Sequence, residues 1–168
     1  MSAMLLAACS ETSQVGNPDL KINELEYFEG TGVNVLVYSN TFNGGFNDEK
    51  NSGIEIIHHG VRTVQGGAVR LNKTPEQWDL VPTTTSRTVD TENNSIEVAL
   101  NYEDYHSDSR IVVTGKGKAG EIAVYLDEPL PAFLEGKAGF NIEFLPSQYW
   151  QKPLLFIVFL AAGKFLVV

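Results

Sequence analysis

The chain has 168 residues, which is enough for one domain with a substantial hydrophobic core. Hydrophobic residues make up 43% of it and charged residues 20%, a composition typical of a folded globular protein and not of a disordered one. Twelve Lys and Arg against 21 Asp and Glu give a net charge of -9, so we expect no binding to nucleic acid. A single cysteine, Cys9, excludes an internal disulfide and the zinc sites that need several cysteines.

The chain begins with nine mostly apolar residues that end at Cys9. Residues 6–9, Leu-Ala-Ala-Cys, resemble the lipobox of bacterial lipoproteins, in which the cysteine sulfur carries a lipid. We interpret residues 1–9 as part of a lipoprotein signal peptide that lacks its basic start, as expected if the true start codon lies upstream. The alternative is an unstructured N-terminus with an ordinary cysteine. Residues 10–20, rich in Ser, Thr, Asn, Pro and Gly, are predicted to be a flexible tether.

From residue 21 to residue 150 apolar and polar residues alternate with a period of two, which is typical of half-buried strands. The alternation is clearest over Ser95–Tyr102, whose even-numbered residues are expected to share one buried face. The predicted strands, in chain order, are 22–28, 33–38, 54–59, 61–64, 68–71, 85–90, 95–102, 110–114, 121–127 and 140–144. Short Gly- and Asn-rich links separate many of them, as at 29–32, 65–67, 91–94 and 116–120, and such links favour antiparallel pairing.

Two short helical turns are predicted among these strands. Thr74, Pro75 and Gln77 match a helix start, and Pro82 limits that helix to about two turns. Residues 131–135, which Gly136 follows, predict a further single turn. About ten strands with one or two such turns predict an all-β fold, an antiparallel β-sandwich, over residues 21–150.

Residues 151–168 form a tail that turns abruptly apolar, with Lys164 as the one charge after Pro153. The uninterrupted apolar run from Leu154 to Gly163 is about half of the roughly 20 residues that a transmembrane helix needs. We therefore expect no membrane-spanning helix here. The tail is interpreted either as a final pair of buried strands or as residues translated out of frame.

His58 and His59 are the first candidates for metal or acid–base chemistry, because imidazole titrates near neutral pH. Neighbouring side chains in a strand point to opposite faces, so we expect that the two cannot bind one ion together. A polar strand end is the favoured interpretation. Residues 40–53 are rich in oxygen ligands suited to calcium, but they match no EF-hand spacing and a long loop is favoured.

Glu103, Asp104 and Asp108 surround His106 in one short segment. Paired carboxylates hydrolyse glycosides when a cleft holds them about 5 to 9.5 Å apart, but nothing in the sequence fixes such a geometry. Solvated side chains are favoured, and a small hydrolase that uses these acids is a weaker alternative. We predict no catalytic residue, no metal site and no cofactor in this chain.

Aromatic side chains in predicted loops and at strand ends are the remaining candidates. Trp78, Tyr102, Tyr105, Tyr149 and Trp150 have flat faces on which sugar rings stack, although such residues also close the ends of sandwiches. Of these we select Trp78, Tyr102 and Tyr105 as candidate carbohydrate-binding residues.

Residues 26–150, about three quarters of the chain, resemble a module of a known enzyme family. The resemblance is carried by residues 32–40 (GVNVLVYSN), 52–63 (SGIEIIHHGVRT), 74–79 (TPEQWD) and 134–147 (LEGKAGFNIEFLPS). These segments look like the N-terminal β-sandwich that precedes the catalytic domain in bacterial glycoside hydrolases of family nine, the cellulase-like family. They identify a module better than an activity.

The resemblance implies a secreted or lipid-anchored protein of the bacterial cell envelope, which agrees with Cys9. In that family an immunoglobulin-like domain and a catalytic α/α barrel follow the sandwich. This chain instead departs from the family pattern after Trp150, which favours an out-of-frame tail. We therefore expect a noncatalytic accessory module of a lipid-anchored polysaccharide-degrading glycoside hydrolase, with the missing catalytic domain as its partner. The alternative is an autonomous cell-surface carbohydrate-binding lipoprotein for plant β-glucan-type glycans.

Overall fold

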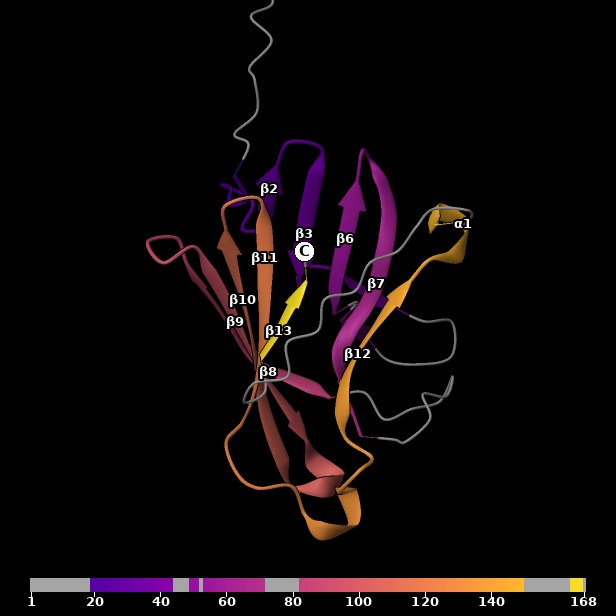
Figure 1. Ribbon diagram of the computed structural model, residues 1–168. Coiled ribbons are helices and arrows are strands. Elements are labelled where there is room, and N and C mark those ends of the chain that lie inside the picture. Colours follow the sequence, from indigo (N-terminus) through magenta and orange to yellow (C-terminus); the bar gives the residue numbers. More distant parts are fainter. Residues whose placement is uncertain (1–18, 44–48, 52, 72–81, 150–163, 168) are drawn as a thin grey trace, which may run out of the picture.

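The fold is an all-β sandwich, which confirms the predicted fold class. The computed structural model describes residues 19–43, 49–51, 53–71, 82–149 and 164–167. These residues form two main antiparallel sheets that face each other, with a short helix and two 3-10 turns at their ends (Figure 1). None of the helical segments in the described part of the chain has the length and apolarity that crossing a membrane requires.

The first sheet has six strands in the order β1-β2-β3-β6-β7-β12. Their bounds are β1 Lys21–Ile22, β2 Phe28–Gly30, β3 Val33–Val37, β6 Ile54–His58, β7 Val61–Arg70 and β12 Gly139–Phe144. The order of the second sheet is β13-β11-β10-β9-β8. Its strands are β8 Thr83–Asp90, β9 Ser95–Tyr102, β10 Ser107–Lys116, β11 Ala119–Leu126 and β13 Lys164–Val167.

The remaining elements are short. A separate hairpin joins β4 (Thr41–Asn43) to β5 (Glu49–Asn51) within the segment expected to be a loop. The 3-10 turn η1 (Glu103–Tyr105) links β9 to β10, and η2 (Ala132–Leu134) confirms the turn predicted at 131–135. The four-residue helix α1 (Pro146–Tyr149) follows β12. The helix predicted from Thr74 lies outside the described residues.

The core lies between the two sheets and is built by alternation. Every even-numbered residue of β9 is buried and every odd-numbered one is half-buried, as predicted for this strand. Fully buried side chains from both sheets meet here, among them Phe28, Ile54, Ile96, Ile111 and Val113. Leu20, placed at the end of the expected tether, is also in this core, so the sandwich includes it.

The strand predicted over 22–28 is wrong in its middle, where the chain turns. The Asn23 side-chain oxygen accepts hydrogen bonds from the backbone N–H groups of Leu25 (3.0 Å) and Tyr27 (3.3 Å). Glu26 has a left-handed backbone with φ of 60°. An asparagine that bonds its own following backbone competes with strand pairing, so β1 ends at Ile22 and β2 begins at Phe28.

The turn predicted at 65–67 is also wrong, because β7 runs unbroken through it. Pairing of β7 with β6 shifts register between Ile54 and Ile56, next to Gly67. A Cβ atom on Gly67 would lie 2.6 Å from the Cβ of Ile54, and Gly66 has a positive φ of 67°. The two glycines therefore allow a bulge and a close approach of neighbouring strands, instead of reversing the chain.

Part of the apolar tail is a strand. Residues 164–167 form β13, which pairs antiparallel with β11 at the edge of the second sheet. For these four residues, the pairing agrees with the interpretation of the tail as strands. Residues 150–163 and 168 lie outside the described part, and translation out of frame stays a prediction about the gene.

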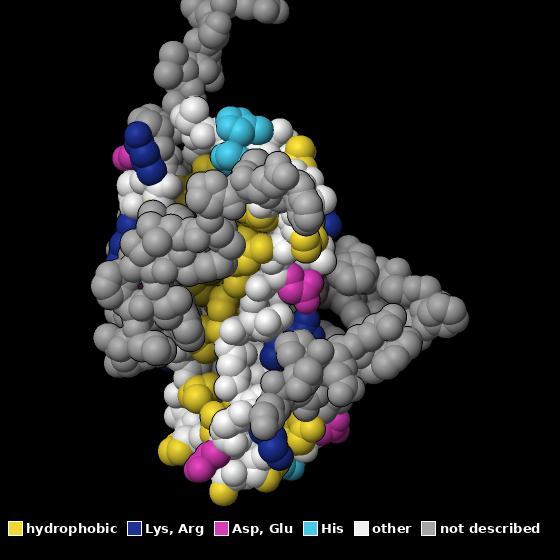
Figure 2. Space-filling model, turned by 45° about the vertical axis from the view of Figure 1, so that its right-hand side comes forward, with side chains coloured by type: hydrophobic (Ala, Val, Ile, Leu, Met, Phe, Trp, Pro, Cys, Tyr) yellow, Lys and Arg dark blue, Asp and Glu magenta, His cyan; other side chains and the backbone are white. Residues whose placement is uncertain are grey.

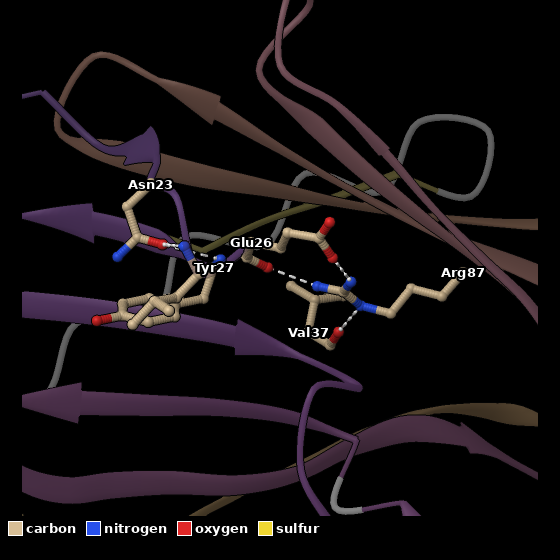
Figure 3. A network of polar contacts seen from close by, with 6 residues as sticks. Asn23, Glu26, Tyr27, Val37 and Arg87 are labelled. Carbon is tan, nitrogen blue, oxygen red and sulfur yellow. Dashed lines mark hydrogen bonds and ion pairs between the residues drawn. The ribbon is translucent and has the colours of Figure 1, made fainter.

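Arg87 joins the two sheets at one edge of the sandwich (Figure 3). Its guanidinium leaves β8 and donates to the backbone carbonyl of Val37 at the end of β3, with Nε 2.9 Å from the oxygen. It also donates to the Glu26 carbonyl (2.5 Å) and pairs with the Glu26 carboxylate (3.0 Å). One side chain thus holds the first-sheet strand end and the Asn23 turn against the second sheet.

Replacing Arg87 by alanine is expected to lower the free energy of unfolding by about 2 kcal/mol, because two carbonyl oxygens lose a charged donor. Lysine should recover only part of this, since one ammonium cannot reproduce the guanidinium fork. Urea unfolding of the two variants measures the effect. Arg110→Ala is the control, because its pairs with Glu97 and Asp127 lie on the exposed outer face and contribute less than about 1 kcal/mol. Equal losses of stability for Arg87→Ala and Arg110→Ala would contradict the conclusion that Arg87 holds the two sheets together.

Candidate functional site

The structure separates the residues selected from the sequence. Cys9 and Trp78 lie outside the described residues, as does Trp150. Tyr102 ends β9 and Tyr105 closes η1, so both belong to the connection between β9 and β10. The candidates that can be placed therefore reduce to two neighbouring tyrosines in different environments.

Tyr102 is a core residue. Its side chain is only 4% exposed and belongs to the central hydrophobic cluster. Its hydroxyl donates a hydrogen bond to the backbone carbonyl of Val69 in β7, across the sandwich. A ring buried in this way offers no face to a sugar, and its position in the alternating pattern of β9 accounts for the burial.

A second buried tyrosine, Tyr38, differs from Tyr102 in the surroundings of its hydroxyl group. It is 6% exposed, and among the described residues its hydroxyl has no hydrogen-bond partner. Burial, followed by the nearby Tyr102, raises the pKa of the Tyr38 hydroxyl, while Arg70 acts in the opposite direction. Burial thus disfavours ionisation of a hydroxyl for which the described residues supply no hydrogen bond.

Exchanging each tyrosine for phenylalanine should therefore change stability in opposite directions. Tyr38→Phe removes a buried hydroxyl without a partner among the described residues and is expected to raise the free energy of unfolding by about 1 kcal/mol. Tyr102→Phe removes the hydrogen bond to the Val69 carbonyl and should lower this free energy by about 1 kcal/mol. Thermal and urea unfolding at pH 7 measure both. The same sign for both variants would contradict the two environments.

The raised pKa of Tyr38 also predicts alkaline behaviour. The folded state favours the neutral hydroxyl of Tyr38. The stability that follows from this preference is fully present below the unfolded-state pKa of about 10 and is lost as the pH rises above that value. Tyr38→Phe should accordingly lose less stability than the parent protein between pH 9 and pH 11.

Tyr105 and Phe133 form an exposed aromatic pair at one end of the sandwich. Tyr105 is half-buried against the core, and Phe133, in η2, is 55% exposed. Their ring centroids are 5.7 Å apart and their planes are tilted by 44°. The β9–β10 connection and the loop after β11 meet at the bottom of Figure 1, and Figure 2 shows hydrophobic side chains (yellow) exposed at this end.

Polar groups border the aromatic pair. Glu103 and Asp104 are exposed in η1, and His106 follows in a left-handed conformation with φ of 48°. Asp108 lies further along in β10, where its carboxylate accepts a hydrogen bond of 2.6 Å from the Asn101 amide. Tilted rings beside exposed acceptors and donors suit a ligand with apolar faces and hydroxyl edges, which is the chemistry of a sugar.

The sequence interpretation missed Phe133 although it predicted the turn that carries it. In this turn Leu134 is buried at 2% exposure, while its neighbour Phe133 points outward. A single 3-10 turn places successive side chains on different sides, so two adjacent apolar residues cannot both face the core. The sequence signal was the presence of two adjacent apolar residues, Phe133 and Leu134, in a predicted surface turn, since one of the two must then face the solvent.

The favoured interpretation of His58 and His59 as a polar strand end agrees with the structure, but the expectation that their side chains point to opposite faces is wrong. Their ring centroids are only 4.3 Å apart, so the two side chains lie together and not on opposite faces. The reason is that β6 ends at His58, and His59 adopts a left-handed backbone with φ of 49°. Alternation holds only within extended backbone, and the turn breaks it. No group of three or more His, Cys, Asp or Glu side chains suited to a metal ion occurs among the described residues.

Comparisons with known proteins add no identification. No family model matches the chain, and neither a curated protein nor a solved structure does. The resemblance of residues 26–150 to the family-nine module therefore stays a hypothesis that rests on the sequence segments themselves.

Proposed function

We propose that this chain is a noncatalytic accessory module of a lipid-anchored, polysaccharide-degrading glycoside hydrolase of the bacterial cell envelope. In this proposal Cys9 carries the lipid, the residues before Leu20 form the tether, and the sandwich supports or orients a separate catalytic domain. The β-sandwich fold and the sequence resemblance of residues 26–150 support it.

The observation that carries the proposal is a set of ion pairs between neighbouring strands of the second sheet. Arg110 in β10 pairs with Glu97 in β9 (3.3 Å) and with Asp127 just after β11 (3.0 Å). Lys116 and Glu121 pair across the β10–β11 hairpin at 2.8 Å. These solvent-exposed pairs link neighbouring strands and contribute little to stability, but they engage the carboxylates within the sheet, which favours a supporting role for the sandwich.

The gene offers the first test. We expect that reading all three frames downstream of the codon for Trp150 reveals a continuation into a hydrolase catalytic domain. A confirmed stop after Val168, with no such domain in any frame, would contradict the accessory role and leave the binding role described next.

A direct assay provides the second test. The purified chain is expected to release no reducing sugar from cellulose or from xyloglucan oligosaccharides. Measurable turnover that disappears on replacing Glu103, Asp104 or Asp108 by alanine would instead establish a small hydrolase.

The second candidate function is autonomous carbohydrate binding at the cell surface, and the Tyr105–Phe133 pair favours it. Phe133 is 55% exposed, and its tilt against Tyr105 gives two aromatic faces on which one glycan can stack. Soluble plant β-glucans are the ligand class that this candidate implies.

Calorimetric titration with soluble β-glucans tests the binding role. If it is correct, Phe133→Ala and Tyr105→Ala should each weaken association by about tenfold, the loss of one stacking face of about 1.4 kcal/mol. Leu25→Ala is the matched control, because it removes an exposed apolar side chain (74% exposed) from the β1–β2 turn. Flat titrations with every glucan would remove the binding role without affecting the accessory proposal.

A further inference from the structure

The tip of the β6–β7 hairpin brings two imidazole rings together. His58 is the last residue of β6, where it pairs with Val33 of β3 and Val61 of β7. His59 and Gly60 then turn the chain, with φ values of 49° and 77°. As a result the two rings lie 4.3 Å apart between centroids, with their planes at 62°.

The neighbouring turn between β2 and β3 fixes the position of the His59 ring. The His59 backbone N–H donates to the carbonyl of Gly32 at 2.8 Å. The ring lies against Gly32 so closely that a Cβ atom there would be 2.6 Å from Cε1 and 2.9 Å from Nδ1 of the imidazole. Gly32 is therefore needed for this packing, and the pair is held by two hairpins instead of by one mobile loop.

Both histidines are exposed to solvent. Figure 2 shows histidine surface (cyan) at the top of the molecule, the end at which β6 and β7 join in Figure 1. An ion can therefore reach the rings directly. The net charge of -9 on the chain attracts cations to the surface as a whole.

The two rings meet edge to face, and the separation of their centroids is the one that two imidazole ligands of one metal ion need. Metal–nitrogen bonds of about 2.0 Å at a right angle place two imidazole centroids roughly 4.5 Å apart. Right-angled nitrogen ligands are those of tetragonal Cu(II) and Ni(II), and among divalent first-row metals nitrogen sites bind Cu(II) most tightly. With two protein ligands, water fills the remaining positions.

We propose that His58 and His59 form a two-histidine surface site for a divalent transition metal ion, with Cu(II) bound in preference to Ni(II) and Zn(II). This site lies at the opposite end of the sandwich from the Tyr105–Phe133 pair. It does not depend on the accessory or the carbohydrate-binding role.

The test is a titration of the full chain with CuCl2, followed by calorimetry and by electron paramagnetic resonance. A Cys9→Ser background removes the one thiol that would compete for copper. We expect one Cu(II) per chain and a spectrum with hyperfine splitting from two equivalent imidazole nitrogens. His58→Gln and His59→Asn should each weaken binding by about tenfold or more.

The third histidine supplies the matched control. His106 is exposed and left-handed like His59, but it lies at the other end of the sandwich, so His106→Asn should leave copper binding unchanged. Asparagine tolerates this backbone, and a circular dichroism melt verifies that each variant is folded. Binding that survives the His58 and His59 replacements, or that the His106 replacement abolishes, would overturn the proposal.

Discussion

Replacing Asn94 by alanine is expected to lower the free energy of unfolding by about 4 kcal/mol, since three hydrogen bonds of about 1 kcal/mol each and a compatible backbone conformation are lost together. The Asn94 amide donates to the carbonyls of Leu20 and Gly115, both at 2.9 Å, and its oxygen accepts from the Ile22 N–H at 3.0 Å. The residue is 7% exposed, so water cannot replace these bonds. It ties the start of the sandwich to the turn before β9 and to the end of β10.

Two further variants separate the contributions at Asn94. Its backbone is left-handed, with φ of 52°, which alanine adopts at a cost of about 1 kcal/mol and glycine adopts freely. Asn94→Gly should therefore be about 1 kcal/mol more stable than Asn94→Ala while still lacking the three bonds. Urea unfolding measures all variants.

Asn93 is the control for the neighbouring position. It is exposed, and its hydrogen bonds in the described part of the chain go to Asp90, whose pKa they lower, so Asn93→Ala should cost far less than Asn94→Ala. If Asn94→Ala and Asn93→Ala prove equally mild, Asn94 is not the link between the three segments.

Alternation predicted the fold because it reports directly on burial. The predicted bounds of 95–102 are those of β9, and the predicted inward side chains are the buried ones. The same pattern placed Tyr102 in the core, while its aromatic character made it a candidate for binding sugar. For Tyr102, alternation predicted burial, whereas a sugar-binding role would require exposure. The structure follows the alternation, because burying a large aromatic ring stabilises the fold more than leaving it in water.

Residues with left-handed backbone account for most of what the sequence did not predict. Glu26 divides one predicted strand, and His59 turns two histidines toward each other. Neither is a glycine, so neither gives the usual signal of a turn. The glycines at 66 and 67 do give that signal, but they lie in a bulge of β7, because a close approach of two backbones also requires glycine.

Long-range polar contacts could also not be predicted from the sequence. Arg87 reaches Val37 across 50 residues, and Asn94 reaches Leu20 across 74. Nothing in the local pattern distinguishes these residues from the exposed Arg110 and Asn93. The Tyr105–Phe133 pair is of the same kind, since two turns far apart in the chain meet only after both sheets have formed.

Replacing Arg62 by alanine is expected to lower the free energy of unfolding by about 3 kcal/mol, because it leaves the buried Glu55 carboxylate without its guanidinium. Glu55 lies in β6 and is 1% exposed, and its carboxylate is 2.8 Å from Nε of Arg62 in β7. The Asn40 amide donates a further hydrogen bond of 2.6 Å to Glu55. The Arg62 side chain is itself 49% exposed, which places the expected loss at the lower end for a buried pair.

A second substitution shows whether the loss comes from the charge of Glu55. Glu55→Gln removes the charge but keeps the shape and an acceptor for Asn40, so the double variant Arg62→Ala with Glu55→Gln should recover about 2 of the 3 kcal/mol. Lys116→Ala is the control, because its 2.8 Å pair with Glu121 leaves that carboxylate 23% exposed and contributes less than about 1 kcal/mol. A double variant no more stable than Arg62→Ala would mean that Arg62 acts through its packing and not through its charge. Because water solvates Glu121 but not Glu55, equal distances in the two pairs should still give unequal losses.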